Sequence, residues 1–458
     1  KDNLLTSSVE LKSNIKSKMT FLVSGYYLKS RYINRNKDSM KVNIFYVNKG
    51  NTYLISISNI LGLEGDCMTN NKFIPLSVPN LSLDILENVK ETIETGWVST
   101  GGRFITEFEE KIAKYVGVER AVACQSGTAG LHLAMRVLGI GPGDEVIVPT
   151  VTFIAAVNPV RYMGAEPIFM DCDDTLNMDM DKLEEFLENE CNFIDGKVIN
   201  KKTKRQIKAV VVVHVFGNPA NMEKLMELKE KYNLKVIEDS TEALGSYYLE
   251  GKYAGKYCGT IGDIGVYSFN ANKIITTGGG GMVVSNNKKL LDKVAFLGVQ
   301  AKTDSLYFIH DEIGYNYRMT NIQAAFGTDQ IDRLEGFIKT KMRNYNLYKK
   351  AIEDINGLTL LPFRTDTRPN YWFYSLIVDK EKYGIDRDEL LIRLNEENIQ
   401  TRPLWRLIHK QKPYLNSQSY RIEKAEYYEA NLINIPCSSN LSEDDVMIVI
   451  DKLKKYKK

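Results

Sequence analysis

The chain has 458 residues, of which 43% are apolar and 26% are charged. This composition is typical of globular domains and excludes a collagen-like, coiled-coil or largely disordered chain. Lysine and arginine number 60 against 58 aspartates and glutamates. The chain therefore lacks the basic excess of proteins that neutralise a phosphate backbone, and nucleic acid is not expected as a partner.

The positive charge is concentrated at the start of the chain. Residues 1–67 hold ten lysines and arginines against five acidic residues, and they contain no Ala, Pro, Gln, His or Trp. The composition changes abruptly at Met68. We therefore expect residues 1–67 to be an N-terminal extension that is poorly ordered or not native. One hypothesis is that they are translated upstream sequence before a true start at Met68, and the alternative is a genuine extension of unknown role.

The cysteines and histidines give no sign of a metal site. The six cysteines are scattered, without a C-x-x-C pair, which argues against a zinc site or a disulfide framework. We interpret them as reduced thiols of a cytoplasmic protein. The four histidines lie far apart, and no metal is expected. Because the chain has no run of about 18 apolar residues, neither a membrane-spanning helix nor a secretory signal is expected.

From residue 73 onward, short apolar runs rich in β-branched residues alternate with segments of helical period. This alternation predicts right-handed crossover connections and an α/β fold with a mainly parallel sheet between helices. Strands are predicted at residues 121–124, 145–148, 167–170, 209–213, 235–238 and 264–269, and helices at residues 104–115, 128–138, 180–187 and 221–232.

The rest of the chain has a different pattern. We predict a large domain at residues 68–330 and a smaller C-terminal α+β domain at residues 331–458. The elements predicted here are a long helix from residue 322 to about 355, strands at residues 358–362 and 371–378, a helix near residues 387–398 and a final helix after Ser442.

The first segment with a chemical signature is Ser126-Gly127-Thr128, which follows a predicted strand and opens a predicted helix. Small residues there let backbone N–H groups approach a phosphate at the positive end of the helix. The alternative is an ordinary helix start with Thr128 as the N-cap. The glycines between Gly139 and Gly143 lack the spacing of a dinucleotide-binding loop, so we interpret them as a turn.

Two further residues complete a pattern. Asp239 ends an apolar strand, at the edge where open α/β sheets place ligands. Lys273 follows another strand and precedes four consecutive glycines. Apolar and glycine-rich surroundings indicate a confined amine, which is the setting that lowers the pKa of a lysine for nucleophilic use. A phosphate cup, an acid for a pyridine nitrogen and a lysine for a Schiff base together predict a pyridoxal phosphate enzyme.

With these motifs, the chain from about Lys72 to its end resembles the DegT/DnrJ/EryC1/StrS family of fold-type I nucleotide-sugar aminotransferases. The resemblance implies that Lys273 is the catalytic lysine and that Asp239 binds the pyridine nitrogen. It also implies an obligate homodimer with two shared active sites. The remaining cofactor contacts that it implies are Ser126, Gly127, Thr128 and Ser268 on the phosphate, Phe153 on the ring, Glu242 beside the acid, and Asn316, which reaches the phosphate bound by the partner subunit.

Two positions depart from the commonest family pattern. Glu242 stands where many members have His or Gln, and Asn270-Ala271 stands where many have His-Pro. Both departures resemble the branch that acts in bacillosamine and legionaminic acid synthesis, although that branch typically has Gly at the position of Ala271. Related dehydratases replace the catalytic lysine by histidine, so Lys273 argues against dehydration.

The resemblance implies transfer of an amino group from L-glutamate to the C4 ketone of a nucleotide-linked 4-keto-6-deoxy sugar. The substrate expected first is a UDP-2-acetamido-4-keto-2,6-dideoxyglucose type of sugar, for a legionaminic acid or bacillosamine type of surface glycan. The alternatives are a perosamine-type GDP-sugar 4-aminotransferase, a 3-aminotransferase, and a protein that binds a nucleotide sugar or pyridoxal phosphate without turnover. The substrate contacts implied by the resemblance are Trp97, Ser99, Tyr371, Arg402 and His409.

Overall fold

The computed structural model describes residues 72–457 and, before them, the backbone of five strands. The chain divides into two units, residues 1–70 and residues 71–458. Apart from the five strands, the predicted extension and the predicted start at Met68 lie outside the described residues. The first unit contains an antiparallel pair of β1 (Thr20–Val23) and β2 (Tyr26–Lys29), and an antiparallel group of β3 (Ile33–Asn36), β4 (Ser39–Asn48) and β5 (Asn51–Ile57).

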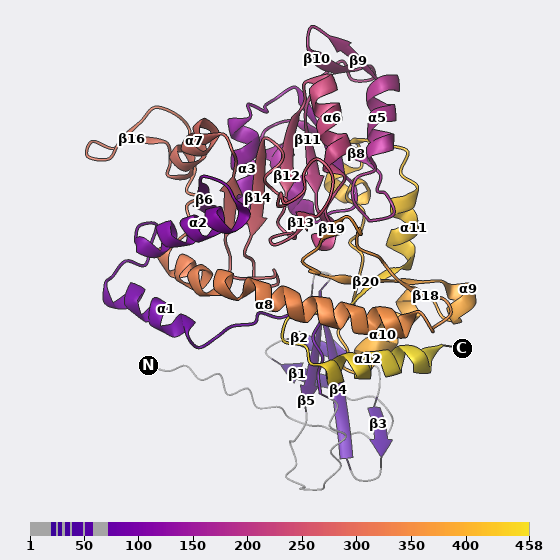
Figure 1. Ribbon diagram of the computed structural model, residues 1–458. Coiled ribbons are helices and arrows are strands. Elements are labelled where there is room, and N and C mark those ends of the chain that lie inside the picture. Colours follow the sequence, from indigo (N-terminus) through magenta and orange to yellow (C-terminus); the bar gives the residue numbers. More distant parts are fainter. Residues whose placement is uncertain are drawn as a thin grey trace. The chain divides into compact units, whose positions relative to one another are not determined.

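A large sheet forms the centre of the second unit (Figure 1). Its strands follow the order β22-β8-β7-β11-β12-β14-β15-β6. Pairing is parallel from β22 to β14, and β15 is antiparallel to both of its neighbours. The predicted α/β fold with a mainly parallel sheet is therefore confirmed. These strands are β6 (Ala121–Cys124), β7 (Asp144–Pro149), β8 (Glu166–Met170), β11 (Gln206–Val213), β12 (Lys235–Asp239), β14 (Ile264–Ser268), β15 (Gly281–Val284) and β22 (Gln418–Tyr420), with the hairpin β9 (Cys191–Ile194) and β10 (Lys197–Asn200) continuing from β11.

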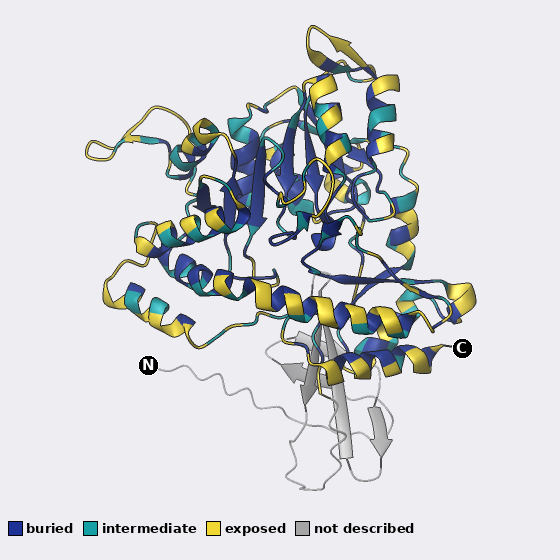
Figure 2. Cartoon of the chain, viewed as in Figure 1, coloured by how far each residue is buried: buried dark blue, intermediate teal, exposed yellow. Residues whose placement is uncertain are grey.

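Both faces of the sheet are buried. Successive side chains of a strand point to opposite faces, and consecutive residues of the central strands lie in two different apolar cores. In β11, Val210 and Val212 belong to one apolar core, and Val211 and Val213 belong to the other. Figure 2 shows the strands buried between helices whose outer sides are exposed. Within the described part of the chain, every helix is too short or too polar to span a bilayer. The helices are α1 (Ile85–Glu94), α2 (Arg103–Val116), α3 (Gly127–Val137), α4 (Asn158–Tyr162), α5 (Met180–Asn189), α6 (Met222–Tyr232), α7 (Lys288–Gly298), α8 (Asn321–Ile352), α9 (Lys380–Tyr383), α10 (Arg387–Glu396), α11 (Lys424–Asn431) and α12 (Glu443–Tyr456).

Helix α8 connects the large sheet to the C-terminal elements. It begins with a capping box in which the side chains of Thr320 and Gln323 each accept from the other's backbone N–H. Lys111 pairs with Asp332 near its start, and Asn344 donates to a carbonyl of the C-terminal segment near its end. The predicted division after residue 330 falls inside this helix and stays a prediction. A four-stranded antiparallel sheet follows α8, with the order β18 (Leu358–Leu360), β20 (Tyr374–Val378), β23 (Leu432–Ile435) and β21 (Arg402–Pro403).

Every predicted strand and helix is present, and its ends differ from the prediction by at most three residues. Helix α3 begins one residue earlier than predicted, with Ser126 rather than Thr128 as its N-cap. Strand β15 was not predicted, because four residues directly after a glycine run look like part of a loop. The short elements that were also not predicted include β13 (Tyr247–Tyr248), β16 (Lys302–Asp304), β17 (Ile309–His310) and β19 (Thr367–Arg368).

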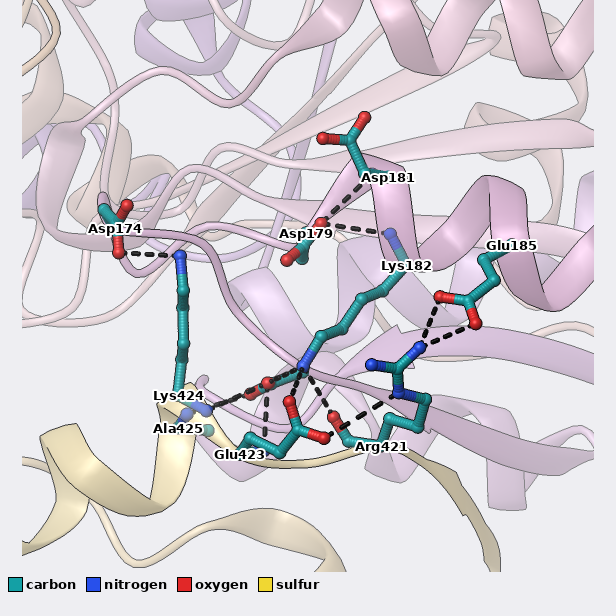
Figure 3. A network of polar contacts seen from close by, with 10 residues as sticks. Asp174, Asp179, Asp181, Lys182, Glu185, Arg421, Glu423, Lys424 and Ala425 are labelled. Carbon is teal, nitrogen blue, oxygen red and sulfur yellow. Dashed lines mark hydrogen bonds and ion pairs between the residues drawn. The ribbon is translucent and has the colours of Figure 1, made fainter.

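The buried carboxylate of Asp171 joins the C-terminal segment to the large sheet. Figure 3 shows the charged side chains of this network, among them Lys182, Glu423 and Lys424. The Asp171 side chain is fully buried and lies 2.7 Å from Lys182 Nζ. It also accepts the backbone N–H groups of Glu423, Lys424 and Ala425 at 2.8 to 3.0 Å. These groups start α11 and have no partner inside that helix. Asp171 therefore fixes α11 against the end of β8.

The pKa of Asp171 reflects this pairing. Burial raises it, but the Lys182 ammonium and the backbone N–H groups outweigh burial, so the pKa lies below its ordinary value of 3.8. The carboxylate thus contributes stability that is fully present above pH 3.8 and is lost as the pH falls through the folded-state pKa.

We predict that Asp171→Asn lowers the free energy of unfolding by about 3 kcal/mol at pH 7, because it removes the buried anion that Lys182 and the backbone N–H groups at the start of α11 share. The Glu423 carboxylate that still pairs with Lys182 is exposed and compensates little. Urea denaturation of both proteins measures the change, and the difference should shrink in acid. The exposed ion pair between Asp174 and Lys424 provides the control, since Asp174→Asn should have little effect. Equal losses for the two variants would contradict this role of Asp171.

Candidate active site

The candidate site lies where β6, β12 and β14 end at one edge of the large sheet. Asp239 ends β12 and is paired with Val266 of β14. Ser268 ends β14 and is paired with Gly281, which in turn is paired with Cys124 at the end of β6. The register therefore brings together three segments that are far apart in the sequence. This edge carries the carboxyl ends of the strands, where α/β sheets bind ligands.

A close-packed cup forms at the start of α3. Ser126 caps the helix by accepting the N–H of Ala129 at 3.1 Å. A Cβ on Gly127 would lie 2.9 Å from Thr241 Cγ2 and 3.0 Å from Ser268 Cβ, and a Cβ on Gly281 would lie 2.7 Å from the carbonyl group of Ser126. Gly127 and Gly281 therefore let three segments pack closely around the N-terminus of α3, which is the end of a helix that can bind a phosphate.

Asp239 is held rigidly at the end of its strand. Its side chain is buried, and Oδ1 accepts the N–H of Thr241 at 3.1 Å. The neighbouring Glu238 is fully buried and accepts two backbone N–H groups at 2.7 Å, and its Oε2 lies 3.1 Å from His214 Nε2. Burial raises the pKa of Asp239, while Thr241 and Lys273 oppose the rise. A cationic partner on the free side of this carboxylate would relieve the cost of burying it.

Lys273 lies beside a second buried acid. Its Nζ atom is 3.7 Å from Glu242 Oε1, and Glu242 Oε2 accepts the N–H of Phe216 at 2.8 Å. Burial lowers the pKa of Lys273, while Glu242 and Asp239 act in the opposite direction. Burial also raises the pKa of Glu242 to about 7, against the attraction of Lys273. The structure thus brings Lys273, Asp239 and Glu242 into one electrostatic group.

These features fit pyridoxal phosphate. The glycine-lined cup at the start of α3 suits a phosphate, and the buried Asp239 suits a pyridinium nitrogen. Lys273 supplies the confined amine, and Ser268 reaches the cup from β14. The side chain of Thr128, in the first turn of α3, is partly exposed.

The other predicted site residues are less tightly surrounded. Phe153 is 55% exposed, and its ring centroid lies 6.4 Å from that of Trp405. Asn316 is also exposed, on a segment whose Tyr317 carbonyl accepts the N–H of Gln125 beside the cup.

The predicted substrate residues occupy different surroundings. Trp97 and Ser99 are exposed on a loop that Asn321 binds through both of their backbone carbonyls. Arg402 is exposed on β21. His409 Nδ1 lies 2.6 Å from Thr150 Oγ1, which places this imidazole next to the segment that carries Phe153.

Tyr371, a predicted substrate contact, and its neighbour Trp372 lie in different surroundings. The Tyr371 ring packs against Phe363 and Tyr345, with centroids 4.8 and 5.2 Å away. The ring of Trp372 instead lies 4.0 Å from Lys273 Nζ. The segment therefore presents the ring of Trp372 to the amine, and the ring of Tyr371 packs elsewhere.

Sequence reasoning missed three residues that shape the site: Thr241 beside the cup, Phe216 on Glu242, and Trp372 on Lys273. Thr241 follows Asp239 by two residues, so an Asx-type turn after the strand was a usable signal. Phe216 and Trp372 reach the site through the register of distant segments, for which a single sequence carries no direct signal.

Comparison with known proteins identifies the family. Residues 79–454 match the model of the DegT/DnrJ/EryC1/StrS aminotransferase family. The chain is 39% identical to the GDP-perosamine synthase of Escherichia coli O157:H7 over 388 residues, covering 84% of this chain and 99% of that protein. It is 36% identical to the putative pyridoxal phosphate-dependent aminotransferase EpsN of Bacillus subtilis, covering 84% of this chain and 95% of that one.

Solved structures agree with this assignment. The aminotransferase TlmJ from Streptoalloteichus hindustanus is similar with a TM-score of 0.75 and 29% identity, over 84% of this chain and 99% of TlmJ. DesI, solved in the presence of its TDP-sugar product, is similar with a TM-score of 0.73 and 27% identity, over 84% and 92% of the two chains. The chain therefore belongs to the DegT/DnrJ/EryC1/StrS aminotransferase family and is a pyridoxal phosphate-dependent sugar aminotransferase of nucleotide-sugar biosynthesis.

Proposed function

We propose that this aminotransferase moves the amino group of L-glutamate to the C4 ketone of a nucleotide-linked 4-keto-6-deoxy sugar, in the cytoplasm, for a surface polysaccharide. The observation that carries the proposal is the buried amine of Lys273, 3.7 Å from Glu242 and within the electrostatic reach of Asp239. Such a group can hold a cofactor and then move a proton beside it.

The proposal includes a set of cofactor contacts, which the close packing around the start of α3 supports. Ser126, Gly127, Thr128 and Ser268 would hold the phosphate, and Phe153 would cover the ring. Asp239 keeps the pyridine nitrogen protonated through a charge-assisted hydrogen bond. When bound, pyridoxal phosphate supplies an electron sink next to the reacting carbon.

Lys273 moves the proton. Because burial lowers the pKa of Lys273, a larger fraction of the amine is neutral near pH 7 than for an exposed lysine. Its Nζ atom could then carry a proton between the substrate carbon and C4′ of the cofactor, the two carbons on either side of the transferred nitrogen. Glu242 orients the amine from 3.7 Å, and the N–H of Phe216 holds Glu242 in place.

For the nucleotide, we propose GDP first. Three relatives that are 39%, 36% and 34% identical are named GDP-perosamine synthase, which supports the perosamine-type alternative over the UDP-linked sugar expected from the sequence. The UDP-linked sugar of the legionaminic acid or bacillosamine type stays as a second candidate, because Glu242 and Asn270-Ala271 resemble that branch.

The substrate pocket belongs to the same proposal. Trp97, Ser99 and Arg402 are exposed and can contact the nucleotide part of the substrate. His409 is fixed by Thr150. Tyr371 stays a proposed substrate contact, and the ring of the adjacent Trp372 contacts Lys273.

We also propose a homodimer in which Asn316 completes the partner's phosphate site. The hairpin of β16 and β17 and the segment after it expose a group of large apolar side chains, as a monomer rarely does. This group lies directly before Asn316 in the sequence and comprises Leu306, Tyr307, Phe308 and Ile313, each at least 69% exposed.

Substrate identity is tested by incubating the purified protein with L-glutamate and either GDP- or UDP-linked 4-keto-6-deoxy sugars. Mass spectrometry should find the amino sugar with the GDP-linked substrate. An amino product from the UDP-linked sugar alone would select the second candidate. A colourless protein that is indifferent to added pyridoxal phosphate and makes no amino product would contradict the enzymatic function.

We predict that Lys273→Ala abolishes turnover, because it removes the buried amine that moves the proton, while the cofactor still binds through its phosphate. Absorbance of the bound cofactor and the mass-spectrometric assay measure the two effects separately. Substantial activity in this variant would refute the role of Lys273.

We predict that Gly127→Ala weakens the binding of pyridoxal phosphate by about tenfold or more, because the added methyl group meets Thr241 and Ser268 within 3.0 Å and moves the cup. Fluorescence titration measures the affinity. Gly336→Ala is the control, since a Cβ at that helix position meets nothing within 4 Å. Unchanged affinity in Gly127→Ala would place the phosphate elsewhere.

The shared site predicts complementation between two defective chains. Lys273→Ala and Asn316→Ala homodimers should each have low activity. After mixing and exchange of subunits, half of the dimers carry one intact site, so about a quarter of the wild-type activity should return. If mixed dimers form and the activity does not recover, Asn316 does not act on the partner's site.

A further inference from the structure

Trp372 contacts Lys273 and its backbone at the same time. Its indole Nε1 donates to the carbonyl of Asn272 at 2.8 Å, across 100 residues of sequence. Its ring centroid lies 4.0 Å from Lys273 Nζ. Trp372 is 2% exposed, and an ammonium interacts more strongly with an aromatic face in such a dry place than at a surface.

Asn370 fixes Trp372 to the turn that carries Glu242. The Asn370 side chain is fully buried, and its Nδ2 donates to the carbonyls of Glu242 and Leu244 at 2.8 and 3.0 Å. Its Oδ1 accepts the N–H of Trp372 at 3.0 Å, and its own N–H donates to Ser246 Oγ at 2.9 Å. One amide therefore connects the two groups that meet Lys273 from different sides.

Tyr371, between Asn370 and Trp372, has a φ of +57°. A left-handed conformation is unfavourable for an aromatic residue and persists where the surroundings enforce it. Here the bonds of Asn370 on one side and of the indole on the other enforce it. The strained backbone at Tyr371 allows the ring of Trp372 to face the Lys273 amine.

We propose that Trp372 is a positioning residue for Lys273: its indole N–H fixes the Asn272–Lys273 peptide, and its ring face attracts the ammonium form and keeps the amine directed into the site. The effect of Trp372 on turnover rests on the proposed function. The two contacts themselves do not depend on which sugar is the substrate.

Three side chains act on the charge of the Lys273 amine: Glu242, Asp239 and Trp372. Glu242 and Asp239 favour its charged form, and burial opposes that form. Trp372 adds attraction to the charged form through its ring. Both carboxylates remain in every variant below. A change in the pKa of Lys273 between these variants therefore measures the contribution of the Trp372 ring.

The test measures the pKa of Lys273 in the full-length protein loaded with pyridoxamine 5′-phosphate, in which the lysine amine is free. Competitive acetylation over a pH series, followed by mass spectrometry of the Lys273 peptide, gives this value without any turnover. We expect the pKa to fall in the order wild type, Trp372→Phe, Trp372→Leu, by about 0.4 to 1.5 pH units across the series.

Fluorinated tryptophan keeps the shape of the side chain and so avoids a folding defect. With 5-fluoro- and then 5,7-difluorotryptophan placed at position 372, ring attraction weakens in steps, and the pKa of Lys273 should fall in steps. A pKa that stays constant or rises in both series would overturn the proposal, since a ring that merely excludes water would give such a result.

Kinetics then separate positioning from stability. In Trp372→Leu, kcat should fall by about 10- to 100-fold with little change in KM, because the amine is misplaced after the substrate binds, and Trp372→Phe should recover part of the loss. Phe186→Leu is the matched control, because it removes another buried aromatic ring, on α5. Equal kcat in Trp372→Leu and Phe186→Leu would also overturn the proposal. Failure of Lys273→Ala to lose activity would instead refute the proposed function and leave the acetylation result intact.

Discussion

The burial of one amine beside two carboxylates is the constraint on which the site depends. A charged lysine away from water costs several kcal/mol unless it is paired. In this protein Glu242 lies 3.7 Å from Lys273 Nζ, and the ring of Trp372 lies 4.0 Å away. Both carboxylates have raised pKa values because they are buried too. The group therefore shares protons easily, which is the property that an amino-transfer site needs.

The fold supplies this arrangement through strand register. Parallel strands β12 and β14 end side by side, so Asp239 and Ser268 lie at the same edge of the sheet. Glu238, one residue before Asp239, is fully buried and is held by backbone N–H groups and His214. Because side chains alternate along β12, Glu238 points to one side of the strand, where it binds backbone N–H groups, and Asp239 points to the other side, where the candidate site lies. Gly127 and Gly281 let the neighbouring segments pack closely around the start of α3.

Local patterns predicted much of this site. Lys273, Asp239 and the start of α3 stand next to strands whose apolar runs are plain in the sequence, and all are found at the same sheet edge. Contacts between distant segments could not be predicted in this way. Trp372 reaches Asn272 across 100 residues, and neither propensity nor spacing tells it apart from its neighbour Tyr371. Strand β15 was missed for a related reason, since its four residues are stabilised by β14 and β6 rather than by their own pattern.

The cofactor linkage of Lys273 is the most direct measure of this arrangement. Reduction of the pyridoxal phosphate-loaded protein with borohydride fixes the cofactor to the amine that holds it, and mass spectrometry of the digested protein locates the label. The geometry of Lys273, Asp239 and Glu242 predicts that the label lies on Lys273. A label on a different lysine, or a loaded protein that takes up no label, would contradict the site described above.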